Sequence, residues 1–478
     1  MSDADVHPLD FLFHPRSVAI VGISSKKREW NAGKMFLDVY RHSGFSGAIY
    51  PVSRSAAEIK GLKCYPSLVD IPGPVDYVIS SIPATGVLQL MDDAAAKGVR
   101  CIHFFTAGFR ETGEEDRVEL ERRVLEKARR AGIRLIGPNC MGLYCPSSGL
   151  AFQYGFPREP GPVAFISQSG LNSQDLINQG ALYGVRFSKV ISYGNAADLD
   201  ESDFFEYCTA DPETEIITSY IEGVKDGRRF LRALKAASAA KPTIVLKGGL
   251  TSAGGRAAHS HTGSLAGSPQ VWDALCRQAG VVSVDSLDEL IDMAITFRFL
   301  KRPAGRGLAV IVIGGGASVL AADGAEKLGL RLPPLSEEVQ AELRQFTPIA
   351  GTSVRNPLDT VPLEADGGLR KTVEIIGRSP AINAILILAR LDWGLPRTGD
   401  VDAFVQGTVN SLVESARQSP VPVALAARAP DNAKVMAAME KFYDLTAKAA
   451  VATYPDFRRA LSAIAKFISW HEARDSLR

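Results

Sequence analysis

Residues 248–267 read GGLTSAGGRAAHSHTGSLAG. This stretch follows an apolar run, Thr243 to Leu246, which predicts a buried strand closed by Lys247. Six of its twenty residues are Gly, so the backbone can adopt positive φ and approach a ligand closely. The pattern therefore predicts a mobile glycine-rich loop directly after a strand.

The chemistry of this loop is set by two histidines and by the absence of carboxylates. His259 and His261 lie in its middle, and no Asp or Glu occurs from Gly227 to Trp272. An imidazole in such surroundings suits a phosphate or phosphoryl group. The alternative is a surface loop whose histidines are merely solvated. The basic residues of the same region are Arg228, Arg229, Arg232, Lys235, Lys241, Lys247 and Arg256.

The order of motifs in this region resembles a known family. Residues 247–249 (KGG), 253–258 (AGGRAA) and 260–267 (SHTGSLAG) are similar to the phosphohistidine loop of the NDP-forming acyl-CoA synthetases, relatives of succinyl-CoA synthetase. In that family the His of SHTG carries the phosphoryl group. The resemblance implies that His261 is phosphorylated, that His259 is incidental, and that the phosphate is bound by Ser260, Thr262 and Gly263.

Length and composition limit the class of protein. A chain of 478 residues is long enough for two to four domains. A net charge of +1 argues against broad attraction to nucleic acid or membranes, and no apolar run is long enough to span a bilayer. The first residues are acidic, unlike a signal peptide. The cysteines are scattered and suggest no metal site, so we expect reduced thiols in the cytoplasm; they are Cys64, Cys101, Cys140, Cys145, Cys208 and Cys276.

Residues 8–145 are expected to form a Rossmann-like first domain. Predicted strands alternate with helical stretches, which implies a parallel sheet covered on both faces. In such sheets ligands bind beyond the carboxyl ends of the strands. The predicted strands are 17–22, 48–52, 75–80, 101–105 and 134–136, and a helix is expected to start near Asn31.

This first domain has the features of a CoA site more than those of a dinucleotide site. The G-x-G-x-x-G fingerprint is missing, because Gly22 is followed only by the distant Gly33. Arg54, rather than an acidic residue, follows the second strand and suits a phosphorylated ribose. The IPA, AGF and GPNC segments resemble the CoA-binding domain of the same synthetases. The resemblance implies CoA contacts from Gly22, Ser24, Ser25, Ser53, Arg54, Ile82, Pro83, Ala107, Gly108, Asn139 and Cys140.

Residues 160–298 are expected to form a second, flavodoxin-like domain, after a linker at 141–161. A strand at 163–166 runs into Ser167-Gln168-Ser169-Gly170 and then a helix. A helix start presents unpaired N–H groups and the positive end of the helix dipole, which together favour an anion. The alternative is an ordinary helix cap built by Ser169. The family resemblance favours the anion, with Ser167, Ser169 and Gly170 as phosphate-binding residues.

Glu222 is the candidate partner for the histidine. It follows a predicted strand at 216–221, and a carboxylate at that end can reach the crevice used by the loop. An imidazole nucleophile needs one ring nitrogen oriented by an acceptor. Glu222 also matches the family's glutamate in YIEG. The alternative is a solvated loop glutamate.

Residues 305–478 are expected to form a third, flavodoxin-like domain. Strands are predicted at 308–313, 384–388 and 421–426, and a helix is predicted at 457–471. Gly314-Gly315-Gly316 and the NPLD segment ending at Asp359 resemble the ligase-associated domain of these synthetases. The fold class is therefore α/β throughout, with one Rossmann-like and two flavodoxin-like domains.

The resemblance implies the CoA-binding, phosphohistidine-carrying alpha subunit of an ADP-forming acyl-CoA synthetase. No region is typical of an ATP-grasp fold and no G-x-x-x-x-G-K-[ST] loop occurs. ATP or ADP with Mg²⁺ is therefore expected on a separate ATP-grasp beta subunit, in a heterotetramer that acts on CoA, phosphate and a small carboxylic acid. Two alternatives remain open: a non-catalytic protein that binds CoA or acyl-CoA for regulation, and an NAD-dependent oxidoreductase.

Overall fold

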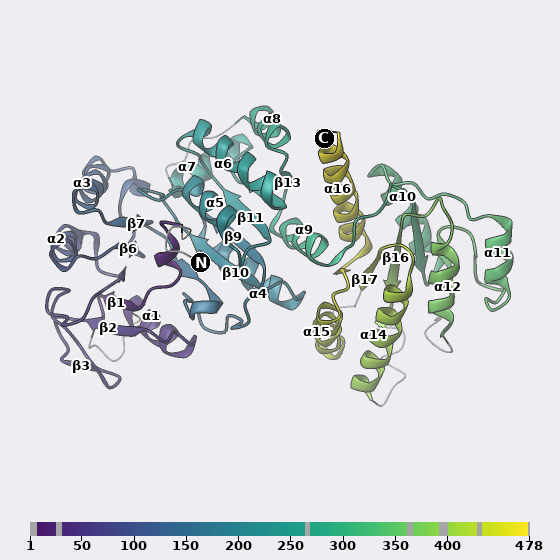
Figure 1. The fold of residues 1–478 in the computed structure, drawn as a ribbon, viewed down its shortest axis with the longest axis horizontal. Helices are drawn as coiled ribbons and strands as arrows, with labels where there is room; N and C mark the ends of the chain where they lie inside the picture. Colours follow the sequence, from purple (N-terminus) through teal and green to yellow (C-terminus); the bar gives the residue numbers. More distant parts are fainter. Residues whose placement is uncertain are drawn as a thin grey trace. The chain divides into compact units, whose positions relative to one another are not determined.

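The computed structural model describes residues 7–24, 31–262, 268–360, 367–391, 400–427 and 433–476, with the backbone alone at 258–262 and 433–434. Its contacts divide the chain into two compact units. Unit 1 comprises Met1–Asn178 with Arg186–Leu287, and unit 2 comprises Gln179–Val185 with Asp288–Arg478. Over the described residues the strands form three main sheets and a small hairpin, and Figure 1 shows helices packed along the main sheets. The predicted α/β fold class is confirmed.

The first sheet of unit 1 is parallel, with strand order β2-β1-β5-β6-β7. Helices α2 and α3 pack side by side (Figure 1). The strand order reverses between β1 and β5, which places a ligand crevice at their carboxyl ends. The elements are β1 (Ser17–Val21), α1 (Ala32–His42), β2 (Ala48–Val52), the hairpin β3 (Glu58–Ile59) and β4 (Leu62–Lys63), β5 (Tyr77–Ser80), α2 (Val87–Lys97), β6 (Cys101–Phe104), the short helix η4 (Arg110–Thr112), α3 (Glu115–Ala131) and β7 (Arg134–Ile136).

The second sheet of unit 1 has strand order β13-β12-β11-β9-β10-β8. All its pairs are parallel except β8 with β10. The order reverses between β9 and β11, so the turns after these two strands share a crevice. The elements are β8 (Gly142–Tyr144), β9 (Val163–Ser167), α4 (Gly170–Leu182), β10 (Phe187–Ser192), α5 (Glu201–Ala210), β11 (Ile216–Ile221), α6 (Gly227–Ala240), β12 (Thr243–Lys247), α7 (Ser252–Thr262), α8 (Pro269–Ala279) and β13 (Val282–Val284).

The sheet of unit 2 is parallel, with strand order β15-β14-β16-β17-β18. Helices α12, α14 and α15 pack in succession along it, while α10 packs with α16 (Figure 1). The elements are α9 (Leu287–Phe299), β14 (Leu308–Val312), α10 (Gly315–Lys327), α11 (Glu337–Arg344), β15 (Leu358–Asp359), α12 (Gly368–Gly377), β16 (Ala384–Ala389), α14 (Val401–Gln418), β17 (Val423–Ala427), α15 (Ala433–Lys448), β18 (Thr453–Tyr454) and α16 (Phe457–Asp475).

Two expectations about local structure are wrong. The supposed linker at 141–161 contributes strand β8, and its aromatic residues Tyr144, Phe152 and Phe156 are buried, with the Phe152 and Phe156 rings 5.1 Å apart. Much of the supposed loop at 248–267 is helix α7. Thr251 starts this helix, because its hydroxyl accepts the N–H of Gly254 at 3.0 Å and its carbonyl accepts the N–H of Gly255 at 2.7 Å. Such a cap offsets the low helix propensity of paired glycines.

No helix in the described part of the chain is both long and apolar enough to cross a membrane.

Candidate functional site

A cavity of about 530 Å³ lies in unit 1, where the carboxyl edge of the first sheet meets the start of α4. We call it the inter-sheet cavity. Both sheets contribute to it through the turns that follow parallel strands, which is where ligands bind in open α/β sheets. It is lined by Asn31, Ala32, Ser81, Ile82, Pro83, Phe105, Thr106, Ala107, Asn139, Cys140, Met141, Gln168, Ser169, Gly170 and Leu171.

The structure brings together part of the set of residues proposed from the sequence. The predicted site residues that line the inter-sheet cavity are Ile82, Pro83, Ala107, Asn139, Cys140, Ser169 and Gly170. Those that lie outside its lining are Gly22, Ser24, Ser53, Arg54, Gly108, Ser167 and Glu222. Ser25 and Gly263 lie outside the described residues, and Ser260, His261 and Thr262 are described only as backbone of α7.

Gly22 and Ser53 shape the first sheet at its switch point. Gly22 has φ 103°, and a Cβ there would lie 2.9 Å from the carbonyl carbon of Ser81. The Ser53 hydroxyl donates to the carbonyl of Ile23 at 2.7 Å, while Arg54 is exposed. The glycine and the serine therefore hold the ends of β1, β2 and β5 together.

The turn after β7 is fixed by a buried histidine. The ring Nε2 of His103 lies 3.0 Å from the carbonyl oxygen of Cys140. Burial lowers the pKa of His103 to about 4, so the ring is neutral near pH 7 and donates to that carbonyl. Burial also raises the pKa of the Cys140 thiol, which is 5% exposed. Cys140 is thus a packed wall of the cavity and not a thiolate nucleophile.

The start of α4 has a capping side chain, and it also has backbone N–H groups that remain available to a ligand. The Ser169 hydroxyl accepts the N–H of Asn172 at 3.3 Å, as in an ordinary N-cap. The Ser167 hydroxyl donates to the carbonyl of Ser169 at 2.8 Å and accepts its N–H at 3.1 Å, which shapes the turn. Within the part of the chain that the structure describes, the N–H groups of Gly170 and Leu171 have no acceptor. A helix start with such groups beside a cavity favours an anion.

Glu222 is buried at the end of β11 and held by three neighbours. It is 4% exposed, so the alternative of a solvated loop glutamate is wrong. The Tyr220 hydroxyl donates to its Oε1 at 3.2 Å, and the Lys247 ammonium donates to its carbonyl at 2.6 Å. Gln168 Oε1 accepts its backbone N–H. Burial lowers the pKa of Lys247, although the neighbouring Glu222 acts in the opposite direction.

The turn after β6 connects the two sheets and borders α7. Glu111 Oε1 accepts the N–H groups of Gly108 at 2.6 Å and Phe109 at 3.1 Å. Its other oxygen accepts from the Asn195 amide at 2.6 Å, in the turn that follows β10. The backbone of α7 packs against η4 in the same turn. The helix that contains His261 therefore lies beside the AGF segment, although about 150 residues separate them in sequence.

Comparison with known proteins covers the same regions. Residues 16–146 match the family described as CoA binding domain, and residues 160–297 match the succinyl-CoA ligase like flavodoxin domain. The chain is 38% identical over 380 residues to acetate–CoA ligase [ADP-forming] II subunit alpha of Pyrococcus furiosus, covering 80% of this chain and 82% of that protein. The chain belongs to the ADP-forming acyl-CoA synthetases.

Two further members of the family extend the comparison. The chain is 37% identical over 383 residues to acetate–CoA ligase [ADP-forming] I of Archaeoglobus fulgidus. The matched region covers 80% of this chain but only 54% of that protein. The dinucleotide forming acetyl-coenzyme A synthetase 1 of Ca. Korarchaeum cryptofilum, solved with phosphate and ADP, is 31% identical with a TM-score of 0.81. That match covers 98% of this chain and 97% of the other. The chain is thus a ligase of the alpha-subunit type, and the regulatory alternative is not favoured.

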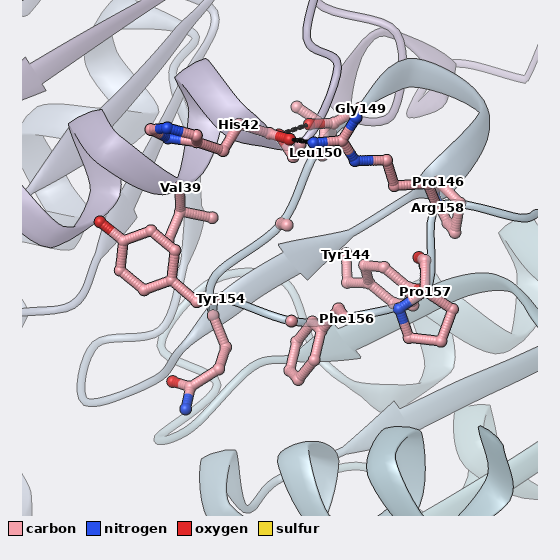
Figure 2. A pocket seen from close by; sticks show the side chains of 14 residues that line it. Val39, His42, Tyr144, Pro146, Gly149, Leu150, Tyr154, Phe156, Pro157 and Arg158 are labelled. Atoms are coloured by element: carbon pink, nitrogen blue, oxygen red, sulfur yellow. Dashed lines mark hydrogen bonds between the residues drawn. The ribbon is translucent and has the colours of Figure 1, made fainter. Parts of the chain in front are cut away.

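Within this synthetase a second cavity, of about 160 Å³, lies at the other end of α1. Figure 2 shows it between the end of α1, with Val39 and His42, and the segment that carries Tyr144, Tyr154 and Arg158. Arg158 donates to the carbonyl of His42 across its rim. None of the predicted site residues lines this cavity.

Sequence reasoning missed several walls of the inter-sheet cavity. Asn31 was expected only to start a helix, which it does by accepting the N–H of Lys34 at 2.9 Å. Met141 fell in the supposed linker, yet a Cβ on Gly170 would lie 2.5 Å from its Cγ. Gln168 stood between two chosen serines and was passed over. A side-chain amide in the turn between a strand and a helix could have marked Gln168 as a candidate site residue. Phe105 and Leu171 gave no signal of their own.

Proposed function

We propose that this chain is the CoA-binding, phosphohistidine-carrying subunit of an ADP-forming acyl-CoA synthetase, built as domains 8–145, 160–298 and 305–478. The observation that carries the proposal is the inter-sheet cavity. In one space it joins the carboxyl edge of the first sheet to the N-terminus of α4. A thioester held by one sheet would therefore meet a phosphate held by the other.

The first wall suits CoA. Ile82, Pro83, Phe105 and Ala107 provide an apolar surface for a pantetheine arm, and Asn139 provides a polar side chain. The start of α1, at Asn31 and Ala32, supports a phosphate of the nucleotide end. We assign the CoA contacts to Ile82, Pro83, Ala107, Asn139 and Cys140, and keep Gly22, Ser24, Ser25, Ser53, Arg54 and Gly108 as the residues that shape or extend the site.

The second wall suits phosphate. Ser169 and Gly170 at the start of α4 present donors to an anion, while Ser167 shapes their turn. In the proposed reaction a phosphate oxygen attacks the thioester carbonyl carbon, the C–S bond breaks, and CoA leaves with a proton as the free thiol. Donors near the developing oxyanion lower the barrier. The products are CoA and an acyl phosphate.

His261 then takes the phosphoryl group. A ring nitrogen of His261 attacks phosphorus, the bond from phosphorus to the acyl oxygen breaks, and a carboxylate leaves. Glu222 accepts from the other ring N–H and stabilises the charged phosphohistidine, and Ser260, Thr262 and Gly263 hold its oxygens. Support for a carboxylate in that role comes from the burial of Glu222 between Tyr220, Lys247 and Gln168.

Transfer to ADP with Mg²⁺ is assigned to an ATP-grasp partner subunit, in a cytoplasmic heterotetramer. The Archaeoglobus relative supports this division, because nearly half of that protein lies beyond the match to this chain. The acid is a small carboxylic acid, as in the relatives named for acetate.

Reconstitution tests the proposal. The purified chain should bind CoA but form no acyl-CoA from acid, ATP and CoA, and a candidate ATP-grasp subunit should restore the reaction. Acid-labile phosphate should then map to His261 by mass spectrometry and be absent in His261→Ala. Label on His259, or robust turnover by the chain alone, would contradict the assignment. Failure with every candidate while CoA still binds would favour the regulatory alternative.

A further inference from the structure

Gln168 lies at the switch point of the second sheet, where its side chain contacts the end of β11 and also lines the inter-sheet cavity. Its Oε1 accepts the backbone N–H groups of Glu222 and Gly223, the latter at 2.9 Å. The backbone N–H of Gln168 donates to the carbonyl of Tyr220 at 3.1 Å. The side chain thus ties the end of β9 to the end of β11, directly before α4.

These contacts determine the orientation of the amide. Two backbone donors converge on one end of the side chain, and only the carbonyl oxygen of an amide can accept them. The NH₂ group must therefore be at the other end. Gln168 is 5% exposed and lines the inter-sheet cavity beside Ser169 and Gly170. Its Nε2 makes no hydrogen bond to any residue that the structure describes, so its two N–H donors are left for whatever fills the cavity.

We propose that Gln168 is an anion-binding residue of this synthetase, whose NH₂ group donates to the phosphate bound at the start of α4. The inference rests on the proposed function and adds a side-chain donor to the backbone donors of Gly170 and Leu171. The same amide fixes the backbone of Glu222, so one residue links the phosphate to the carboxylate assigned to His261. A neutral amide does this without placing a second negative charge beside the anion.

The two ends of the amide can be separated by substitution. Gln168→Glu keeps an oxygen to accept the N–H groups of Glu222 and Gly223, but replaces the donors with a second acceptor. We expect the Kd for inorganic phosphate, measured by calorimetry at pH 7.5, to rise about thirtyfold or more, because a donor is lost and a charge is added. The melting temperature and the Kd for CoA should stay near the wild-type values.

Two further variants complete the design. Gln153→Glu makes the same isosteric change in the cavity of Figure 2 and should leave the phosphate Kd unchanged. Gln168→Met removes both ends of the amide and should weaken phosphate binding and lower the melting temperature together. If neither Gln168 variant folds, a wild-type chain labelled with ¹⁵N-glutamine decides the matter. One side-chain NH₂ signal should shift on titration with phosphate and stay in place in a chloride control.

The outcomes separate this inference from the proposed function. Unchanged phosphate affinity in folded Gln168→Glu, or no NH₂ signal that responds to phosphate, would overturn the role of Gln168 while leaving CoA binding intact. A wild-type chain that binds neither CoA nor phosphate would instead contradict the proposed function itself.

Discussion

Helices α4 and α10 start in the same kind of place, yet their first turns face different chemistry. Each follows a strand at the switch point of a parallel sheet, α4 after β9 and α10 after β14. At α10 the Asp359 carboxylate accepts the N–H of Gly314 at 2.7 Å, and its other oxygen would lie 3.2 Å from a Cβ on Gly315. At α4 the neighbouring side chains are the neutral Ser169 and Gln168.

The cavities beside the two helices differ in the same way. The inter-sheet cavity reaches the first turn of α4. The cavity at the carboxyl edge of the unit 2 sheet, about 780 Å³, also reaches the first turn of α10, at Ala317, but its lining includes the carboxylates of Asp323 and Asp456. At α10 a protein carboxylate already occupies the helix start, while the cavity at the start of α4 is lined by no carboxylate, as the proposed anion site requires. The sequence motif alone does not distinguish the two cases.

Making α4 resemble α10 should have the largest effect. Ser169→Asp places a carboxylate at the start of α4, as Asp359 does for α10. Asp caps a helix as well as Ser does, so the melting temperature should hold. Phosphate-dependent cleavage of acyl-CoA should fall about a hundredfold or more, because the added charge repels the anion. Steady-state rates with varied phosphate give the measurement. Normal phosphate dependence in the variant would show that α4 binds no phosphate.

Glu222→Gln should have the next largest effect. The amide keeps the size of the side chain and its contact with Tyr220, but it loses the charge that stabilises a phosphohistidine. We expect phosphorylation of His261 in the reconstituted complex to slow about tenfold to a hundredfold, with CoA affinity nearly unchanged. Rapid-quench labelling and calorimetry measure the two quantities. Loss of CoA binding with normal labelling would refute the assigned role.

Asp359→Ala is the reciprocal change at α10. It removes the acceptor for the Gly314 N–H and should lower the free energy of unfolding of unit 2 by about 1 kcal/mol. Urea denaturation measures this change. The KM for phosphate should stay at the wild-type value. A shifted KM would mean that the start of α10 also takes part in phosphate binding.

The smallest effect concerns Glu201, the first residue of α5. Burial raises its pKa to about 8, with the neighbouring Asp200 adding to the shift. The folded protein therefore keeps a proton that the unfolded chain has lost, and stability falls as pH rises through 8. Between pH 7 and 9 this amounts to about 1 kcal/mol. Glu201→Gln should remove this loss, seen as a flatter dependence of the unfolding free energy on pH. An unchanged slope would show that Glu201 is ionised in the folded state.

Much of the fold follows from local pattern. Apolar runs between turn residues predicted β2, β7 and β11 with the bounds that the structure has, and β1 with one residue more, because the strands of a parallel sheet covered on both faces are largely apolar. Asn31 and Ser169 were expected at helix starts, and both accept a first-turn N–H. The motifs of residues 247–267 and of the GPNC segment were enough to indicate the family.

Other features depend on residues far apart in the chain. The helical state of residues 252–262 was missed, because paired glycines favour a loop until Thr251 caps the first turn and η4 packs alongside. Strand β8 was missed because an edge strand gains its hydrogen bonds from a partner about fifty residues away. The side chains that lie at a helix start are likewise set by the tertiary structure. At α10 this side chain is Asp359, which comes from the neighbouring strand, and at α4 it is Gln168, which the end of β11 holds in place.

The sequence by itself thus determined many of the central strands, some of the helix starts and the family, since these depend on short-range patterns of burial and capping. Only the tertiary structure decided which turns share a cavity and which buried amide faces it, because hydrogen-bond partners from distant strands fix both.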